Sequence, residues 1–277
     1  MEDAVIAFIR LVRLFGWIGL LAPFQVALLM VKAPMASRLP HMFHRGACRI
    51  LGLKVEIRGQ CSSEKPTLFI CNHTSYLDII VLGGVLQGYF VAKREVAGWP
   101  LFGFLARLQR TVFVERRAAA TARHRDEMIE RLEAGDSLIL FPEGTSNDGN
   151  RVLPFKSAFF AVAEQPVHGR PLAVQPVSIA YTKLDGIPMG RRYRPYYAWY
   201  GDMDLAGHLW EVAGLGRATA VVAFHPVVTI AEFGNRKRLA AHCERMVAEG
   251  VSDAISGRVT PPAESGGQTA SAVQTGA

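Results

Sequence analysis

Short apolar runs of strand-like composition alternate with helix-like stretches through most of this chain. Beyond residue 50, such runs occur at residues 53–57, 67–71, 89–92, 112–114, 137–141 and 173–181. The clearest helix-like stretch covers residues 118–134 and stops at Gly135, a residue type that favours helix ends. The alternation predicts an α/β domain with a mainly parallel or mixed sheet flanked by helices. In such sheets, the turns after the strands gather functional residues at one edge.

The N-terminal part of the chain has a different pattern. Residues 14–31 form an apolar run without a charge, about as long as the ~18 residues that mark a membrane-helix candidate. The run lacks the small-residue cleavage site of a signal peptide. Pro23 interrupts it and basic residues flank it, so both a clean span and a bent, re-entrant segment fit. We expect attachment to the inner (cytoplasmic) membrane, with the following domain facing the cytoplasm because the positive flank follows the run.

These patterns divide the chain into three parts. Residues 1–50 are predicted to be membrane-associated helices, and residues 51–256 to form the α/β domain. The last part, residues 257–277, is small, polar and without periodicity, so we expect a disordered tail.

Composition and charge narrow the partners. The chain has 277 residues, of which half are hydrophobic, and a formal charge of +7. This positive balance favours anionic lipid surfaces, acidic carrier proteins or nucleic acid. The four cysteines are scattered without a CxxC pair, so neither a zinc site nor a disulfide framework is predicted; they are Cys48, Cys61, Cys71 and Cys243.

The turn at residues 71–80, CNHTSYLDII, holds the first candidate chemistry. One interpretation is structural: Thr74 or Ser75 caps a helix, Ser75 and Asp78 form a capping box, and His73 fills the turn. The other is catalytic: a carboxylate one turn away orients an imidazole, which then acts as a general base. The local sequence allows both interpretations.

A second turn, FPEGT at residues 141–145, favours the catalytic interpretation. Together, the N-H-x-x-x-x-D block and the later F-P-E-G-T block resemble those of the glycerolipid acyltransferase family, whose bacterial type member acylates lysophosphatidate. Residues 93–103 and 113–116 resemble a third family segment between these blocks, and the resemblance covers residues 51–181. It implies an enzyme that moves an acyl group from a thioester to the hydroxyl of a lysolipid. His73 would take the proton of the hydroxyl, and Asp78 would orient the imidazole, without an acyl-enzyme.

The resemblance also implies the residues that hold the acceptor. Glu143, Gly144 and Thr145 would line its site, Glu143 by bonding a polar group of the acceptor or by bracing the turn. Arg116 would form paired bonds to a phosphate head group, and Lys93 would supply a point charge.

Ser146 departs from the lysophosphatidate acyltransferase pattern, which has a phosphate-binding arginine at this place. Ser146 and Asp148 suit a head group that carries an amine, although Arg151 and Lys156 could supply the missing cation. Residues 141–158 resemble the lyso-ornithine lipid O-acyltransferases, the branch that esterifies a 3-hydroxyl fatty amide of ornithine. We therefore expect lyso-ornithine lipid as acceptor, with phosphatidic acid synthesis as the alternative, alone or as a second activity.

Other functions fit the sequence less well. The basic and aromatic run at residues 191–200 could contact nucleic acid, but it also describes a membrane-interface belt. A non-catalytic lipid-binding protein is disfavoured by the intact His73 and Asp78. Cys71 as nucleophile and a metal at His73 are disfavoured because a strand-end cysteine usually packs and a third ligand is absent nearby. We expect no nucleic acid partner and no cofactor: the partners are membrane lipids, the lysolipid, and acyl carrier protein or coenzyme A as thioester co-substrate.

Overall fold

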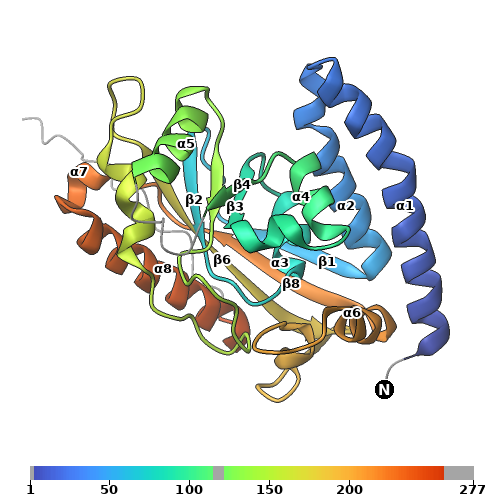
Figure 1. Ribbon diagram of the computed structural model, residues 1–277. Coiled ribbons are helices and arrows are strands. Elements are labelled where there is room, and N and C mark those ends of the chain that lie inside the picture. Colours follow the sequence, from blue (N-terminus) through green and yellow to red (C-terminus); the bar gives the residue numbers. More distant parts are fainter. Residues whose placement is uncertain (1–2, 115–121, 259–277) are drawn as a thin grey trace, which may run out of the picture.

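A central mixed sheet organises the domain (Figure 1). The structure is a computed structural model that describes residues 3–114 and 122–258. For residues 122–126 it describes the backbone only. The strand order is β1-β8-β6-β2-β5-β3-β4, and β7 pairs with β6. The strands are β1 (Leu53–Arg58), β2 (Thr67–Cys71), β3 (Tyr89–Lys93), β4 (Val112–Val114), β5 (Leu138–Leu140), β6 (Ala173–Leu184), β7 (Ile187–Pro188) and β8 (Ala218–Phe224).

Strand direction divides the sheet into two parts. From β6 through β2, β5 and β3 to β4 all neighbours are parallel, whereas β8 pairs antiparallel with β6 and carries β1 parallel to itself. The predicted α/β class with a mixed sheet is confirmed, and each of the six predicted strand runs overlaps an observed strand. Strand β8 was not predicted, although it lies between β1 and β6. Because β2 and β5 are parallel neighbours, the turns that follow them meet at one edge.

Helices cover both faces of the sheet. They are α1 (Ala4–Met30), α2 (Leu39–Leu51), α3 (Leu77–Gly83), α4 (Phe102–Leu108), α5 (Ala122–Glu133), α6 (Leu205–Gly214), α7 (Ile230–Phe233) and α8 (Arg236–Ser256). Short 3₁₀ segments lie at Pro34–Ser37, Arg94–Gly98, Ser157–Glu164 and Arg194–Tyr197. The predicted helix at residues 118–134 is α5 in its described part, and its beginning lies outside the described residues.

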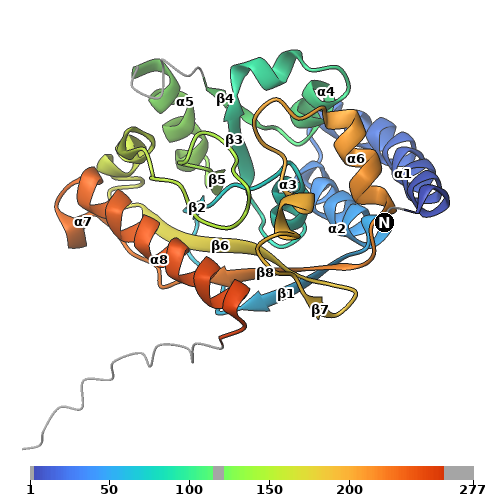
Figure 2. The ribbon, with the colours of Figure 1, turned by 90° about the horizontal axis from the view of Figure 1, so that it is seen from below.

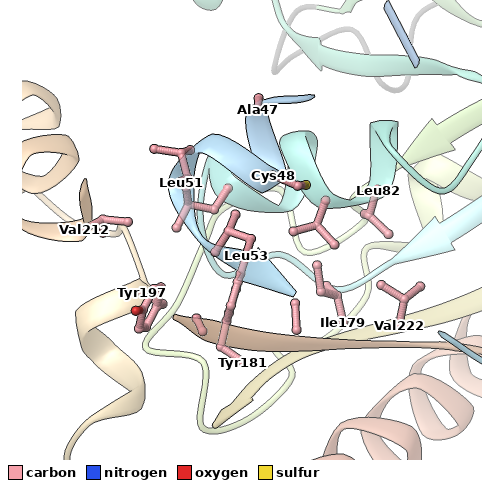
Figure 3. Close-up of a cluster of buried hydrophobic side chains, with 14 of the residues drawn as sticks. Ala47, Cys48, Leu51, Leu53, Leu82, Ile179, Tyr181, Tyr197, Val212 and Val222 are labelled. Atoms are coloured by element: carbon pink, nitrogen blue, oxygen red, sulfur yellow. The ribbon is translucent and has the colours of Figure 1, made fainter. Parts of the chain in front are cut away.

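Two hydrophobic clusters hold these layers together. On one face, side chains of α2 and α3, such as Leu51 and Leu82, pack with Ile179 and Val222 of the sheet (Figure 3). On the other face, α5 and α8 cover Leu68, Leu138 and Val174. Burial of each such large side chain stabilises the fold by roughly 1.5–3 kcal/mol. The two faces thereby fix the sheet whose edge carries the candidate site.

The apolar N-terminal run forms part of α1, which begins where Asp3 accepts hydrogen bonds from Val5 and Ile6. Pro23 lies inside this helix and does not end it. Among the described helices, α1 alone is long and apolar enough to cross a membrane. Its most apolar stretch of 18 residues has a mean hydropathy of 2.0, and 11% of that stretch is buried. Buried core helices and signal sequences pass the same test, so this is weak evidence of membrane association.

One side of α1 is fastened to the domain by polar groups. Arg10 donates to the carbonyls of Ala213 and Leu215, at 3.2 and 2.6 Å. Near the other end, Gln25 donates to the carbonyls of Ala36 and Leu108, at 2.9 and 2.8 Å. The opposite side exposes large apolar side chains, namely Val5, Phe8, Ile9, Val12, Phe15, Leu20 and Phe24. Helix α1 lies along one side of the domain (Figure 1), and its exposed apolar side chains face away from the domain.

Candidate active site

Asn72 prolongs strand β2 by one residue through its side chain. Its amide nitrogen donates to the carbonyl of Ile179 at 2.9 Å, and its amide oxygen accepts from the N–H of Ile179 at 2.8 Å. The side chain thus takes the place of a backbone pairing partner for β6. The main chain is free to leave the sheet after Asn72, and it does so at His73.

His73 and Asp78 form the centre of the site. The distance between His73 Nδ1 and Asp78 Oδ2 is 2.9 Å. The same oxygen accepts from the N–H groups of Thr74 and Ser75, and Oδ1 accepts from the hydroxyl of Tyr181 at 3.0 Å. Because Oδ2 already accepts two N–H groups, Nδ1 carries the proton and donates it to the carboxylate. The other ring nitrogen, Nε2, is then the basic one.

The surroundings of His73 leave this basic nitrogen accessible. The His73 side chain is 22% exposed, whereas Asp78 is fully buried. The ring of Phe141 stacks on the imidazole, with centroids 4.2 Å apart, and Phe90 stacks behind Phe141. Within the described residues, Nε2 makes no hydrogen bond. This is the arrangement of a general base: oriented by a buried carboxylate on one side and open to a proton donor on the other.

The capping-box interpretation is realised only in part. Asp78 does accept from the Ser75 N–H, but the N–H of Asp78 bonds the Ser75 carbonyl rather than its hydroxyl. The residue before α3 is Tyr76, whose side chain makes no cap bond. Asp78 therefore binds the backbone of the turn and the His73 imidazole at the same time. Capping of the helix does not explain the bond to His73.

Glu143 braces the second turn instead of facing outward. Its Oε1 accepts from the N–H of His73 at 2.8 Å, and its Oε2 accepts from the Asn147 amide at 2.8 Å and the Leu153 N–H at 3.0 Å. Burial raises the pKa of this carboxyl to about 7, although all three donors oppose the shift. Of the two predicted roles, the contacts match bracing. Glu143 ties the turn after β5 to the turn after β2.

Gly144, Thr145 and Ser146 continue this turn along the edge of the site. Gly144 has a φ of +68°, and a Cβ there would lie 2.8 Å from Lys156 Nζ, so a cation lies against the turn. Thr145 is exposed. The Ser146 hydroxyl donates to the carbonyl of Trp199 at 2.5 Å. Ser146 therefore holds another part of the chain, a use that its sequence position did not suggest.

Of the two predicted cations, Lys93 and Arg116, the structure describes only Lys93. Lys93 ends β3, two strands from β2 at the same edge, and pairs in register with Val114 of β4. Arg116 lies outside the described residues, so its predicted phosphate contact stays a prediction.

Tyr181 and Asn147 are partners that the sequence analysis did not name. Tyr181 reaches Asp78 from β6, and Asn147 donates to the His73 carbonyl at 3.3 Å as well as to Glu143. The local sequence gives no signal for the contacts of Tyr181 with Asp78 and of Asn147 with His73, because these partners are far apart in the sequence. Only the pairing of β6 with β2 brings Tyr181 to the site.

Three of the four cysteines are buried and therefore have little reactivity. Cys71 is fully buried, and burial together with the negative charge of Asp78 raises the pKa of its thiol well above the ordinary value. Cys48 and Cys243 are also buried, Cys61 is exposed, and all four are free thiols. Within the described part of the chain, there is no group of three or more side chains able to hold a metal ion.

Comparison with known proteins supplies the context of this geometry. A family model described as Acyltransferase matches residues 52–180. The lyso-ornithine lipid O-acyltransferase of Brucella abortus is 43% identical over 247 residues, which cover 88% of this chain and 92% of that protein. The 1-acyl-sn-glycerol-3-phosphate acyltransferase of Neisseria gonorrhoeae is 30% identical over 212 residues, covering 76% and 79%. The crystal structure of the 1-acyl-sn-glycerophosphate acyltransferase PlsC from Thermotoga maritima has the same fold, with a TM-score of 0.67 at 23% identity, covering 93% and 97%.

Proposed function

Since the chain belongs to the glycerolipid acyltransferase family, we propose that it moves a fatty acyl group from an acyl thioester to the 3-hydroxyl of lyso-ornithine lipid. The observation that carries this proposal is the 2.9 Å bond between His73 Nδ1 and Asp78 Oδ2, which leaves Nε2 open. The acceptor is supported by the relative in Brucella abortus and by the serine at position 146.

The proposed reaction begins with the acceptor hydroxyl at His73 Nε2. The imidazole takes the proton while the oxygen attacks the thioester carbonyl, and the buried Asp78 carboxylate stabilises the resulting imidazolium. The carbon–sulfur bond then breaks, and His73 returns the proton to the departing thiolate. The products are the ester and a free thiol, and the histidine ends neutral, as it began. No covalent enzyme intermediate is needed.

The thioester donor is an acyl carrier protein or coenzyme A. The formal charge of +7 suits an acidic carrier protein in particular, because opposite charges steer association. Assays with each donor, at matched acyl chain, distinguish them. Coenzyme A also carries negative phosphates, so salt should slow the encounter with either donor, and the donor is identified by the higher kcat/KM at one salt concentration.

The proposed location is the cytoplasmic face of the inner membrane. The exposed apolar side of α1 supports insertion into the lipid, while the bonds of Arg10 and Gln25 to the domain favour a helix lying in the interface over one that leaves the domain to cross the bilayer. Lysolipid acceptors would then reach His73 from the same leaflet.

A second acceptor, lysophosphatidate, is favoured by one contact. Lys156 lies against Gly144 and supplies a cation at the turn where Ser146 replaces an arginine. The 30% identical Neisseria gonorrhoeae relative adds support.

Competition between the two acceptors tests the proposal. Purified full-length protein is mixed with acyl thioester and equal amounts of lyso-ornithine lipid and lysophosphatidate, and both products are quantified by mass. We expect the ornithine product to dominate and to disappear with His73→Ala. A wild-type protein that acylates lysophosphatidate alone would contradict the acceptor and leave the acyl transfer in place.

A further inference from the structure

The segment between β7 and α6 is folded against the two turns of the active site. The Trp199 N–H donates to the carbonyl of Thr74 at 3.0 Å, and the Trp199 carbonyl accepts from Ser146 at 2.5 Å. Further back, Arg194 Nε donates to Asn150 Oδ1 at 2.8 Å. Figures 1 and 2 show this golden segment beside the yellow-green loop that follows β5. The basic and aromatic run at residues 191–200 is thus part of the wall around the site.

Asn150 links the loop after β5, which carries Asp148, to the segment after β7, which carries Arg191. Its backbone N–H and its side-chain amide each donate to Asp148, at 3.1 Å, and the same amide nitrogen donates to the Arg191 carbonyl at 3.2 Å. Arg151 follows Asn150 directly. None of the ion pairs in the described part of the chain involves Asp148, Arg151 or Arg191. Asp148 therefore forms no direct ion pair with Arg151 or Arg191, although both guanidinium groups are near enough for their charges to act on its carboxylate.

The electrostatics keep this carboxylate charged. Partial burial opposes ionisation of Asp148, but the two bonds from Asn150 and the positive charges of Arg151 and Arg191 outweigh it and lower the pKa of the carboxyl. Beneath it, Arg194 is 8% exposed and bonds only neutral oxygens, those of Asn150 and Met189. The negative charge of Asp148 also acts on this buried cation, so one carboxylate stands among three arginines. The excess positive charge favours an anionic ligand group nearby.

The loop that carries Asp148 rests directly on the histidine turn. Asn147 donates to the His73 carbonyl, and Gly149 lies so close to Thr74 that a Cβ would stand 2.9 Å from its methyl carbon. Asp148 lies between these two contacts. In lyso-ornithine lipid, six covalent bonds separate the reacting hydroxyl oxygen from the ornithine carboxylate carbon, and nine separate it from the ammonium nitrogen. A hydroxyl placed at His73 would bring that head group to this loop.

We propose that Asp148, Arg191 and Arg151 form the head-group site of the acceptor and select a zwitterionic amino-acid head. Asp148 binds the ammonium, and the two arginines bind the carboxylate. The inference rests on the proposed function. A phosphate monoester would also attract the arginines, but it would meet repulsion from Asp148, which gives discrimination as well as affinity. Ser146 contributes indirectly, because its small side chain lets the Trp199 segment close on the loop.

Modified acceptors separate the two halves of the site. Lyso-ornithine lipid is compared with its δ-N-acetyl derivative, its methyl ester, and lysophosphatidate, using full-length enzyme and one thioester donor. Asp148→Asn should lower kcat/KM for lyso-ornithine lipid by about 10- to 100-fold, mainly through KM, as expected for one charge-assisted bond. It should have little effect on the N-acetyl derivative and should raise the use of lysophosphatidate.

Arg191→Gln supplies a second, independent reading. The Arg191 side chain makes no hydrogen bond in the described structure, so its replacement should leave the loop folded even if Asp148→Asn disturbs it. The variant should lose activity on lyso-ornithine lipid but little on the methyl ester. Matched controls are Asp202→Asn and Arg217→Gln, which replace exposed residues outside the 191–200 run, and both should behave as wild type.

The outcomes distinguish this inference from the proposed function. Wild-type activity on lyso-ornithine lipid, with unchanged preference among the four acceptors in both variants, would overturn the head-group site and leave the function standing. Absence of wild-type activity on lyso-ornithine lipid would overturn both. Loss of discrimination confined to the ammonium in one variant and to the carboxylate in the other would establish the site.

Discussion

Asp78 serves two purposes with one side chain, because its carboxylate accepts from His73, two backbone N–H groups and Tyr181. These donors hold the negative charge in a fully buried position, where an unpaired charge would cost several kcal/mol. They also prevent the carboxylate from turning away from the imidazole. The orientation of His73 is therefore built into the turn before any substrate arrives.

Replacing His73 by alanine should remove the base. We expect turnover to fall by about 10²- to 10⁴-fold, the contribution of general acid–base catalysis, in a protein that keeps its fold and vesicle binding. Asp78→Asn should also reduce turnover, since it leaves the imidazole without its anionic partner. Steady-state rates, with circular dichroism as the control for folding, measure this. A folded His73→Ala enzyme with near-normal turnover would rule out the proposed base.

Glu143 should make stability depend on pH. Its pKa is raised from 4.5 to about 7 in the folded protein, so its contribution is fully present below about pH 4.5 and is lost as pH rises through about 7. Glutamine has no proton to lose. The stability deficit of Glu143→Gln relative to wild type should therefore shrink between about pH 5 and pH 8, by up to roughly 3 kcal/mol. Urea unfolding at both pH values measures it, and a deficit that grows with pH would mean that the three N–H donors outweigh burial.

At the residue scale, the sequence predicts contacts between neighbours in the chain better than contacts between distant residues. The His73 and Asp78 pair is local, five residues apart, and the predicted contact between them is present. The contacts of Tyr181, and of Ser146 with Trp199, depend on strand order and on where a distant segment folds back. No local pattern encodes these, so the role of Ser146 as a link to Trp199 emerged only from the structure.

Among the elements, α8 packs against β6 and the residues after β8 with little free space. A Cβ at Gly250 would stand 2.6 Å from His225 Nε2 and also meet the Ser178 hydroxyl. Helix propensity alone favours alanine over glycine by about 0.5–1 kcal/mol. Overpacking costs about 1–3 kcal/mol, so the crowding should decide the sign.

Gly250→Ala should therefore destabilise the protein, and Gly19→Ala in α1, where nothing lies within 4 Å, should stabilise it slightly. Denaturant unfolding of the two variants measures the contrast. Activity at low temperature should be unchanged in both, because neither position touches the site. Stabilisation by Gly250→Ala would show that α8 can shift away from the sheet at little cost.

The element pattern also shows why most strands, but not β8, were predictable. Runs such as residues 67–71 are bounded by turn residues, and four consecutive apolar residues at 68–71 make this one conspicuous. β8 is rich in alanine, a residue that favours helices, and follows α6 after a short Gly-containing link. Its strand conformation comes from pairing on both sides, with β1 and β6, which is tertiary context.

For the molecule as a whole, the outward face of α1 decides where the enzyme works. Phe8 and Phe15 are 61% and 48% exposed and lie two turns apart on that face. Burying one phenylalanine in lipid is worth about 1.5–3 kcal/mol, so each replacement by glutamate should weaken vesicle binding by about tenfold or more. Flotation with lipid vesicles measures the bound fraction.

Ile187→Glu is the matched control, because Ile187 is 71% exposed on β7 and is not part of the outward face of α1. It should float as the wild type does, and equal release by all three substitutions would contradict a role for this face. Point changes are preferable to removing residues 1–33, since truncation would also strip Arg10 and Gln25 from their partners and uncover core side chains.

The unequal burial of the cysteines has a practical consequence for spectroscopy. Cys48, Cys71 and Cys243 are enclosed, and burial raises the pKa of the Cys48 and Cys243 thiols to about 12, whereas Cys61 stands in the exposed link between β1 and β2. A maleimide dye added to the native enzyme should therefore attach at Cys61 alone. That link precedes β2, whereas His73 follows it, so the dye would sit at the opposite end of the strand. A fluorophore there could report the approach of a labelled carrier or lipid during turnover without any engineered cysteine.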